Sequence, residues 1–184
     1  MKSNLAEFDL FEGQVVRRDS RVTVIAAVDG DEFRAHLRNT GRLNRLIYPG
    51  STVLCRWKKT GKTDARVLGA VDGGSVVLLD TYVQERSFEK LVNARALDWL
   101  PENLELTNRV SCGEKRFDFG FESDGRSGFI ELKSAVTCEN GRGSYPDAPS
   151  ERGLEHVESL TRLSGEGVPV YVVFVLTHPD CGRF

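Results

Sequence analysis

The sequence predicts a mixed α/β protein, with a small OB-like β-barrel over residues 1–80 followed by an αβββαβ domain over residues 81–184. Two observations carry this prediction. The first 80 residues contain short runs rich in β-branched or alternating side chains, separated by Gly-rich turns, which is typical of a small closed barrel. After Asp80 the spacing of apolar residues changes to that of a helix, and strand patterns and a second helix follow.

Five runs in the first part are expected to be strands. The clearest is Glu32–Arg38, where Phe33, Ala35 and Leu37 should point into the core because successive side chains of a strand alternate between its faces. The other runs are Arg21–Val28, Ser51–Trp57, Arg66–Val71 and Val76–Leu79. An OB-like barrel fits this length, and an SH3-like barrel fits it almost as well.

The second part should contain two helices and four strands, in the order αβββαβ. Apolar residues at helical spacing predict a helix over Ser87–Trp99, stopped by Pro101. A second amphipathic helix is expected over Ser150–Ser164, with Ser150 as its N-cap. The strand candidates are Leu104–Val110, Arg116–Glu122 and Gly128–Ala135, expected as consecutive antiparallel hairpins, and the nearly all-apolar Val168–Leu176.

Composition narrows the class of protein. The chain has 184 residues, 40% of them hydrophobic, which excludes a disordered, collagen-like or coiled-coil protein. Its four cysteines form no CxxC pair and its three histidines are scattered, so we expect reduced thiols and no structural zinc site. The N-terminus lacks the pattern of a signal peptide, and the longest apolar run is too short to cross a membrane. The sequence therefore predicts a cytoplasmic protein without a membrane partner.

Charge is unevenly distributed along the chain. The net charge of −2 combines 13 basic and 10 acidic residues in the first 80 positions with 12 basic and 17 acidic residues afterwards. The segment Arg34–Arg66 holds nine basic side chains and one acidic one, Asp64. Such a run is either a solvated surface or a nucleic-acid-binding patch, in which Tyr48 and Trp57 would stack bases or pack in the core. The candidate nucleic-acid-binding residues are Arg34, Arg38, Arg42, Arg45, Arg56, Lys58 and Lys59.

The strongest chemical signal is Asp118, followed thirteen residues later by Glu131-Leu132-Lys133. Counted back from the turn at Ser123–Ser127, Asp118 and Glu131 should stand opposite each other on neighbouring strands. Glu131 and Lys133 are two residues apart and should share one face. Two carboxylates could hold Mg²⁺ or Mn²⁺, and the lysine could orient a water or stabilise charge on a phosphate. The alternative is a surface ion pair.

The two predicted helices offer further candidates. Glu89 would supply a third metal ligand, unless it is there only because acidic residues suit the first turn of a helix. Arg152 and His156 lie one turn apart, beside the apolar stripe of Leu154, Val157 and Leu160. They could bind phosphate and transfer a proton, or form a surface ion pair and a histidine at the core margin.

Several motifs together resemble those of the sugar fermentation stimulation protein A (SfsA) family. They are Ala35-His36-Leu37-Arg38-Asn39-Thr40-Gly41-Arg42-Leu43 with Pro49-Gly50, Arg116-Phe117-Asp118-Phe119, Glu131-Leu132-Lys133, and Tyr145-Pro146-Asp147-Ala148-Pro149-Ser150-Glu151-Arg152-Gly153-Leu154-Glu155-His156. Chance can supply a Glu-x-Lys triplet, but not the last motif in register with the others.

The resemblance implies an OB-like domain that binds DNA, fused to a nuclease-like domain of the PD-(D/E)xK restriction-endonuclease type. It implies Asp118 and Glu131 as metal ligands, Lys133 as the catalytic lysine, and Asp147, Arg152 and His156 as residues of the cleft. Tyr145 stands where the family usually has Phe, and Arg109 stands where an acidic residue is expected. The chain also ends at Phe184, earlier than typical members, so a piece that covers the cleft or supports a homo-oligomer is expected to be missing.

The leading hypothesis is a Mg²⁺- or Mn²⁺-dependent nuclease of DNA or RNA, gripping its substrate through the basic barrel and cutting at Asp118, Glu131 and Lys133. The alternative is a non-catalytic DNA-binding regulator of sugar-metabolism genes that uses the same barrel. A protein-interaction module is the third and weakest interpretation. Fold-level analogy does not decide among them, because one fold serves many functions.

Overall fold

The computed structural model describes residues 5–184, apart from the side chain of Arg152. The chain forms two compact units, each assembled from separate stretches of sequence. The first contains residues 5–84, Ser134–Ala148 and Leu176–Phe184, and the second contains Glu85–Lys133 and Pro149–Val175. Two later segments thus belong to the unit of the N-terminal strands. No helix in the described part is long and apolar enough to cross a membrane.

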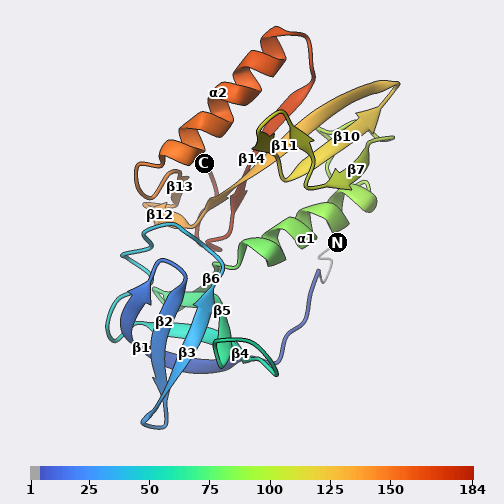
Figure 1. Cartoon of the computed structure of the whole chain (residues 1–184). Coiled ribbons are helices and arrows are strands. Elements are labelled where there is room, and N and C mark those ends of the chain that lie inside the picture. Colours follow the sequence, from blue (N-terminus) through green and yellow to red (C-terminus); the bar gives the residue numbers. More distant parts are fainter. Residues whose placement is uncertain (1–4) are drawn as a thin grey trace. The chain divides into compact units, whose positions relative to one another are not determined.

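Strands of the first unit close into a barrel, drawn from blue to teal in Figure 1. They are β1 (Phe11–Ser20), β2 (Thr23–Val28), β3 (Asp31–Leu37), β4 (Thr52–Trp57), β5 (Ala65–Asp72) and β6 (Ser75–Leu78). The sheet order is β3-β2-β1-β4-β5-β6, and β3 pairs again with β5, in parallel. This second pairing closes a five-stranded barrel, which confirms the predicted closed barrel.

The barrel core is built from alternate residues of its strands. Phe33, Ala35 and Leu37 are buried as predicted, while Arg34 and Arg38 between and beside them are exposed. Fully burying one large aliphatic side chain contributes about 1.5–3 kcal/mol to the free energy of folding. The burial of alternate side chains along each strand is therefore what mainly fixes the strand register. Strand β1 was not predicted, because only Gly13 and Val15 of its ten residues are buried and its apolar pattern is too short to detect.

The second unit follows the predicted order of main elements. These are α1 (Thr81–Asn93), β7 (Glu105–Asn108), β10 (Phe119–Ser123), β11 (Arg126–Ala135), α2 (Glu151–Gly165) and β14 (Val170–Leu176). The four strands form one sheet in the order β14-β11-β10-β7, in which both neighbours of β10 are antiparallel to it. Ser150 caps α2 as predicted, since its Oγ accepts a hydrogen bond from the Gly153 N–H at 3.0 Å. The remaining strands are short: β8 (Ser111–Cys112) with β9 (Lys115–Arg116), and β12 (Thr137–Glu139) with β13 (Arg142–Ser144).

Helix α1 lies six residues earlier than predicted. The sequence pattern missed its N-cap, the fully buried Asp80, whose Oδ1 accepts a hydrogen bond from the Val83 N–H at 3.1 Å. The helix ends before Arg95, which adopts a left-handed conformation with φ of 53°. Trp99, taken as the end of the apolar stripe, is 49% exposed beyond the helix.

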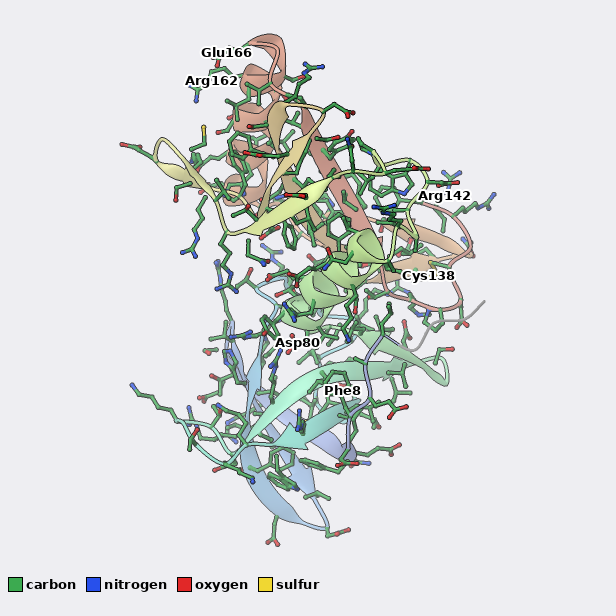
Figure 2. All side chains as sticks on the ribbon, turned by 90° about the vertical axis from the view of Figure 1, so that its right-hand side faces the viewer. Phe8, Asp80, Cys138, Arg142, Arg162 and Glu166 are labelled. Atoms are coloured by element: carbon green, nitrogen blue, oxygen red, sulfur yellow. A yellow bond between two sulfur atoms is a disulfide. The ribbon has the colours of Figure 1, made fainter. Side chains whose placement is uncertain are left out.

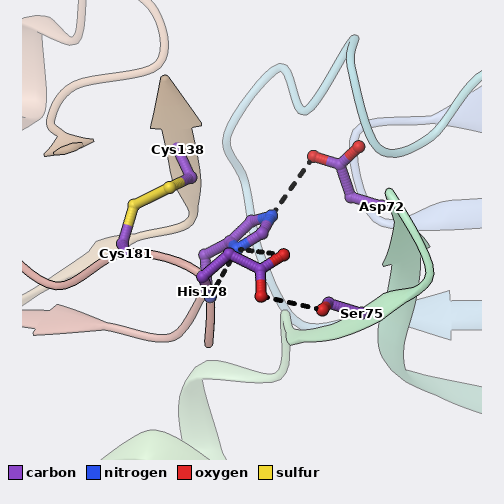
Figure 3. The surroundings of a disulfide bond; sticks show 6 residues. Asp72, Ser75, Cys138, His178 and Cys181 are labelled. Atoms are coloured by element: carbon purple, nitrogen blue, oxygen red, sulfur yellow. Dashed lines mark hydrogen bonds and ion pairs between the residues drawn. A yellow bond between two sulfur atoms is a disulfide. The ribbon is translucent and has the colours of Figure 1, made fainter. Parts of the chain in front are cut away.

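A disulfide between Cys138 and Cys181 contradicts the expectation that all four thiols are reduced (Figure 3). Cys138 lies in β12, and Cys181 lies in the C-terminal segment of the same unit. Further bonds hold that segment: the Gly143 N–H donates to Arg183 O at 2.8 Å, and Ser75 Oγ donates to Asp180 Oδ1 at 3.1 Å. Irregular cysteine spacing hid the pairing, because the two residues are 43 positions apart.

Removing this disulfide should lower the free energy of unfolding by about 2–4 kcal/mol, because the cross-link restricts the unfolded chain over a long loop. Urea unfolding of a Cys138→Ala/Cys181→Ala variant, compared with the oxidised wild type, measures the loss. Cys112→Ala, which changes a half-buried free thiol, is the matched control and should cost much less. Equal urea midpoints for the double variant and the wild type would contradict the prediction.

Candidate metal and phosphodiester site

The β10–β11 hairpin places the three central residues of the sequence motif. Phe119 pairs with Ile130, so Asp118, which immediately precedes β10, stands across from Glu131. The Leu132 N–H donates to Asp118 Oδ2 at 2.8 Å, which ties this carboxylate to β11. Lys133 follows two residues later and points to the same side, since its Nζ donates to Glu131 Oε1 at 2.9 Å. The structure thus brings Asp118, Glu131 and Lys133 together.

Glu131 is the centre of a buried polar network. Its side chain is 7% exposed, and Oε1 contacts both Lys133 Nζ and, at 2.6 Å, His156 Nδ1. The other carboxylate oxygen, Oε2, is buried and has no hydrogen-bond partner among the described residues. A buried carboxylate oxygen without a partner is costly, so Oε2 is the atom of this site that most needs a ligand.

Asp118 carries the clearest electrostatic strain of the site. Burial raises the pKa of its carboxyl group to about 6, and the nearby charges of Glu131 and Glu85 add to the increase. The hydrogen bond from Leu132 and the charge of Lys133 act in the opposite direction. The negative charges around Asp118 therefore outweigh the positive ones, which favours binding of a proton or a metal cation.

Helix α2 contributes His156 through a different face from the one predicted. The buried residues of the helix are His156, Leu160 and Leu163, whereas Leu154 and Val157 are 61% and 39% exposed. The apolar stripe chosen from the sequence was therefore right at Leu160 and wrong at Leu154 and Val157, because the polar His156 takes a core position by bonding to the buried Glu131. The side chain of Arg152, predicted to bind phosphate, lies outside the described residues.

Of the two carboxylates on α1, it is Glu85 whose charge acts on Asp118. Glu85 also forms an ion pair with Arg109, with 3.6 Å between Oε2 and Nη2. Glu89 is bonded to Arg86 and to Asn108 instead. Its assignment as a metal ligand stays a prediction. Within residues 5–184, no group of three or more His, Cys, Asp or Glu side chains has metal-binding geometry.

The predicted nucleic-acid-binding residues lie on strands and in two loops of the first unit. Arg34 and Arg38 lie on β3 or at its end, and Arg56 lies on β4, all exposed on the outside of the barrel. Arg34 is paired with Asp19 at 3.1 Å. Lys58 and Lys59 belong to the exposed segment between β4 and β5, where Lys58 Nζ donates to Thr63 Oγ1.

Arg42 and Arg45 lie instead in the loop between β3 and β4, beside a pocket of about 240 Å³ that Asp147 also lines. Arg45 is paired with Glu139. Asp147 Oδ2 accepts a hydrogen bond from the Leu43 N–H at 2.8 Å, so the aspartate of the Tyr145-Pro146-Asp147 motif holds this loop. Asp147 and this loop belong to the first unit. The second unit contains the residues that surround Glu131, namely Asp118, Lys133 and His156.

Comparison with known proteins identifies both parts of the chain. The family model described as the SfsA N-terminal OB domain matches residues 16–79, which identifies the barrel as the OB type. The model described as the sugar fermentation stimulation protein RE domain matches residues 82–184. The sugar fermentation stimulation protein homolog of Pyrococcus furiosus is 34% identical over 175 residues, which cover 95% of this chain and 76% of that protein. The homolog of Acetivibrio thermocellus is 33% identical over 180 residues, with 95% and 76% covered.

The same fold is known from an experimental structure. The structure of Pyrococcus furiosus SfsA in complex with Ca²⁺ superimposes with a TM-score of 0.93 at 34% identity, covering 100% of this chain and 80% of that one. Sequence and fold agree over both units. The chain therefore belongs to the sugar fermentation stimulation protein (SfsA) family.

Proposed function

We propose that this protein is a divalent-cation-dependent phosphodiesterase that cleaves nucleic acid at the site formed by Asp118, Glu131, Lys133 and His156. The observation that carries the proposal is that the two carboxylate oxygens of Glu131 are bonded differently. Its Oε1 takes both nitrogen contacts, and its buried Oε2 is left without a partner. Together with the raised pKa of Asp118, this favours a cation held by Asp118 and Glu131 Oε2.

The donor set suits a hard divalent cation. Carboxylate oxygens are the ligands preferred by Mg²⁺, Mn²⁺ and Ca²⁺, and waters and substrate oxygens would complete the coordination. The Ca²⁺ complex of the related Pyrococcus furiosus protein supports a divalent cation in this family. When bound, such a cation lowers the pKa of an attacking water and neutralises charge on the phosphate.

Lys133 and His156 have separate roles in this proposal. Lys133 is held at the site by Glu131, so its ammonium group is positioned to stabilise the charge that develops on the phosphate oxygens. An ionised carboxylate only accepts hydrogen bonds, so His156 Nδ1 must be the donor towards Glu131. In neutral His156 the lone pair is then on Nε2, which can accept the proton that water loses as the new P–O bond forms. The P–O bond to one sugar oxygen breaks in the same displacement, and that oxygen leaves as an alkoxide that takes a proton from solvent.

Nucleic acid is the proposed substrate because the barrel supplies exposed basic side chains that a phosphate backbone would attract. A second candidate function is nucleic-acid binding without turnover, as in the DNA-binding regulator considered from the sequence. It is favoured by the exposed basic side chains of the barrel, which would bind a phosphate backbone whether or not the second unit cleaves it.

A cleavage assay separates the two candidates. The full chain is incubated with labelled single-stranded DNA, duplex DNA or RNA, in Mg²⁺, Mn²⁺ or EDTA, beside Lys133→Met and the control Glu122→Gln. Glu122 is an exposed carboxylate on the same hairpin. We expect metal-dependent cleavage by the wild type and the control, and a rate at least about 10³-fold lower for Lys133→Met. Cleavage that survives Lys133→Met, or no cleavage of any substrate, would contradict the proposal.

A further inference from the structure

A stacked cluster of two arginines and one tyrosine lies on the first unit, which contains none of the residues of the proposed reaction. The guanidinium carbon of Arg38 is 4.9 Å from the centre of the Tyr82 ring, and that of Arg66 is 5.5 Å from it. The main chain fixes this arrangement: the Thr81 N–H and Oγ1 both donate to Arg38 O, at 3.1 and 2.9 Å. Tyr82 follows directly in the first turn of α1.

Arg66 has hydrogen-bonding capacity that the described residues do not use. Its Nε donates to Asp80 Oδ2, while its Nη2 is buried and has no partner within residues 5–184. Asp80, the carboxylate bonded to Arg66, is fully buried and also caps α1; Figure 2 labels it at the start of the helix. A buried guanidinium nitrogen without an acceptor is costly, and a negative charge held nearby would reduce that cost.

Three guanidinium groups gather around this cluster. Arg38 forms no ion pair among the described residues, and Arg56 lies next to Arg66 because the two are directly paired across β4 and β5. Of the three, Arg66 is the one whose ion pair is with Asp80. The N-terminus of α1 adds a partial positive charge. By contrast, Arg34 and Arg45 of the same charged segment are each bonded to an acidic side chain.

We propose that Arg38, Arg66 and Tyr82 form a phosphate-binding clamp. Tyr82 holds both guanidinium groups by cation–π contact. The exposed Arg38 and the accessible part of Arg66, whose side chain is 25% exposed, then offer N–H groups to the oxygens of a phosphate. This inference rests on the proposed function in one respect, since it takes the phosphate to belong to the backbone of the nucleic-acid substrate. It assigns binding to two residues, Arg66 and Tyr82, that are not among the candidate nucleic-acid-binding residues chosen from the sequence.

The test measures binding of a fluorescein-labelled single-stranded oligonucleotide to the full chain, in EDTA so that no metal-dependent cleavage occurs. Arg38→Gln should weaken binding about tenfold at low salt and reduce the slope of log affinity against log salt by about 0.7. Tyr82→Leu should weaken it about two- to fivefold, and Tyr82→Phe should restore wild-type binding. Arg17→Gln is the matched control, with an expected change below about twofold because Arg17 is not among the candidate binding residues and its charge is already paired with Glu32.

Removing Arg66 would leave Asp80 buried without its cation, so Arg66→Lys is used and its folding is checked by circular dichroism. This variant should keep the fold and lose affinity, since lysine lacks the two-pronged donor of arginine. Wild-type affinity and salt slope in both Arg38→Gln and Tyr82→Leu would overturn the clamp. Equal losses in Arg17→Gln and Arg38→Gln would also overturn it, because they would indicate a diffuse basic surface.

Two further arms separate the source of the phosphate and the two proposals. In the first arm, the protein is titrated with inorganic phosphate in a calorimeter. Binding heat that Arg38→Gln abolishes would support a clamp that also accepts free phosphate. Oligonucleotide binding without such heat would support a clamp for the nucleic-acid backbone. In the second arm, Arg38→Gln is combined with Lys133→Met, and oligonucleotide binding is compared with that of Lys133→Met alone. Weaker binding by the double variant would support the clamp even if the wild type cleaves no substrate. If the wild type cleaves and Arg38→Gln binds as tightly as the wild type, only the clamp is overturned.

Discussion

Asp118→Asn should abolish cleavage and, at the same time, stabilise the metal-free protein at neutral pH. The loss of cleavage follows because asparagine removes the negative charge that would hold the cation, and a drop of at least about 10³-fold is expected. The gain in stability follows because burial and the neighbouring carboxylates disfavour the ionised form of Asp118. Asparagine keeps an oxygen that can accept the hydrogen bond from Leu132.

The pH dependence of that gain has a defined sign. The pKa of Asp118 is about 6 in the folded protein and about 4 in the unfolded chain, so the folded state binds the proton more tightly. The contribution of Asp118 to stability is therefore lost as pH rises from about 4 to 6. Asp118→Asn should exceed the wild type by about 1–3 kcal/mol at pH 7.5, and by little at pH 4.5.

Urea unfolding at these two pH values, in EDTA, measures the difference. Adding Mg²⁺ or Mn²⁺ at pH 7.5 should stabilise the wild type and leave Asp118→Asn unchanged, because only the folded wild type holds the cation. Glu122→Gln, which changes an exposed carboxylate of the same hairpin, should behave like the wild type. A less stable Asp118→Asn protein at pH 7.5 would show that the carboxylate is not electrostatically strained.

Glu131→Leu should destabilise the protein by about 3–5 kcal/mol. The substitution leaves the Lys133 ammonium, 8% exposed, without the carboxylate to which it is bonded, and removes the acceptor of His156. Glu131→Leu/Lys133→Leu removes both charges and should recover most of the loss, as expected when the cost comes from an uncompensated buried charge.

The exposed ion pair between Lys115 and Glu155 of the same unit supplies the comparison. Glu155 is 55% exposed, so Glu155→Leu should change the free energy of unfolding by less than about 1 kcal/mol. Denaturant unfolding of the two single variants and the double variant tests this. A Glu131→Leu protein as stable as Glu155→Leu, or a double variant no more stable than Glu131→Leu, would be incompatible with a buried ion pair.

The proximity of Asp118, Glu131 and Lys133 was predictable because it depends on local rules. A short turn sets the hairpin register, and the strand period of two puts Glu131 and Lys133 on one side. The N-cap Ser150 was predictable for a similar reason, since capping involves residues three apart.

Features that depend on long-range contacts were not predictable in this way. The apolar Leu154 and Val157 of α2 imitate a core stripe, and only the buried Glu131 shows why His156 is turned inward instead. The pairing of Cys138 with Cys181 depends on the C-terminal segment returning to the first unit. Charge counting grouped Arg38 with Arg45, although Arg45 is paired with Glu139 from a distant hairpin.

Calorimetric titration of the metal-free protein with Mn²⁺ at pH 7.5 tests the proposed site most directly. We expect the wild type to bind the cation, Asp118→Asn and Glu131→Gln to lose this binding, and Glu122→Gln to retain it. Each variant converts a carboxylate into an amide of nearly the same shape. The comparison therefore isolates the negative charge at each position. Wild-type binding of Mn²⁺ by Asp118→Asn and Glu131→Gln, or no binding by the wild type, would contradict a cation site at Asp118 and Glu131.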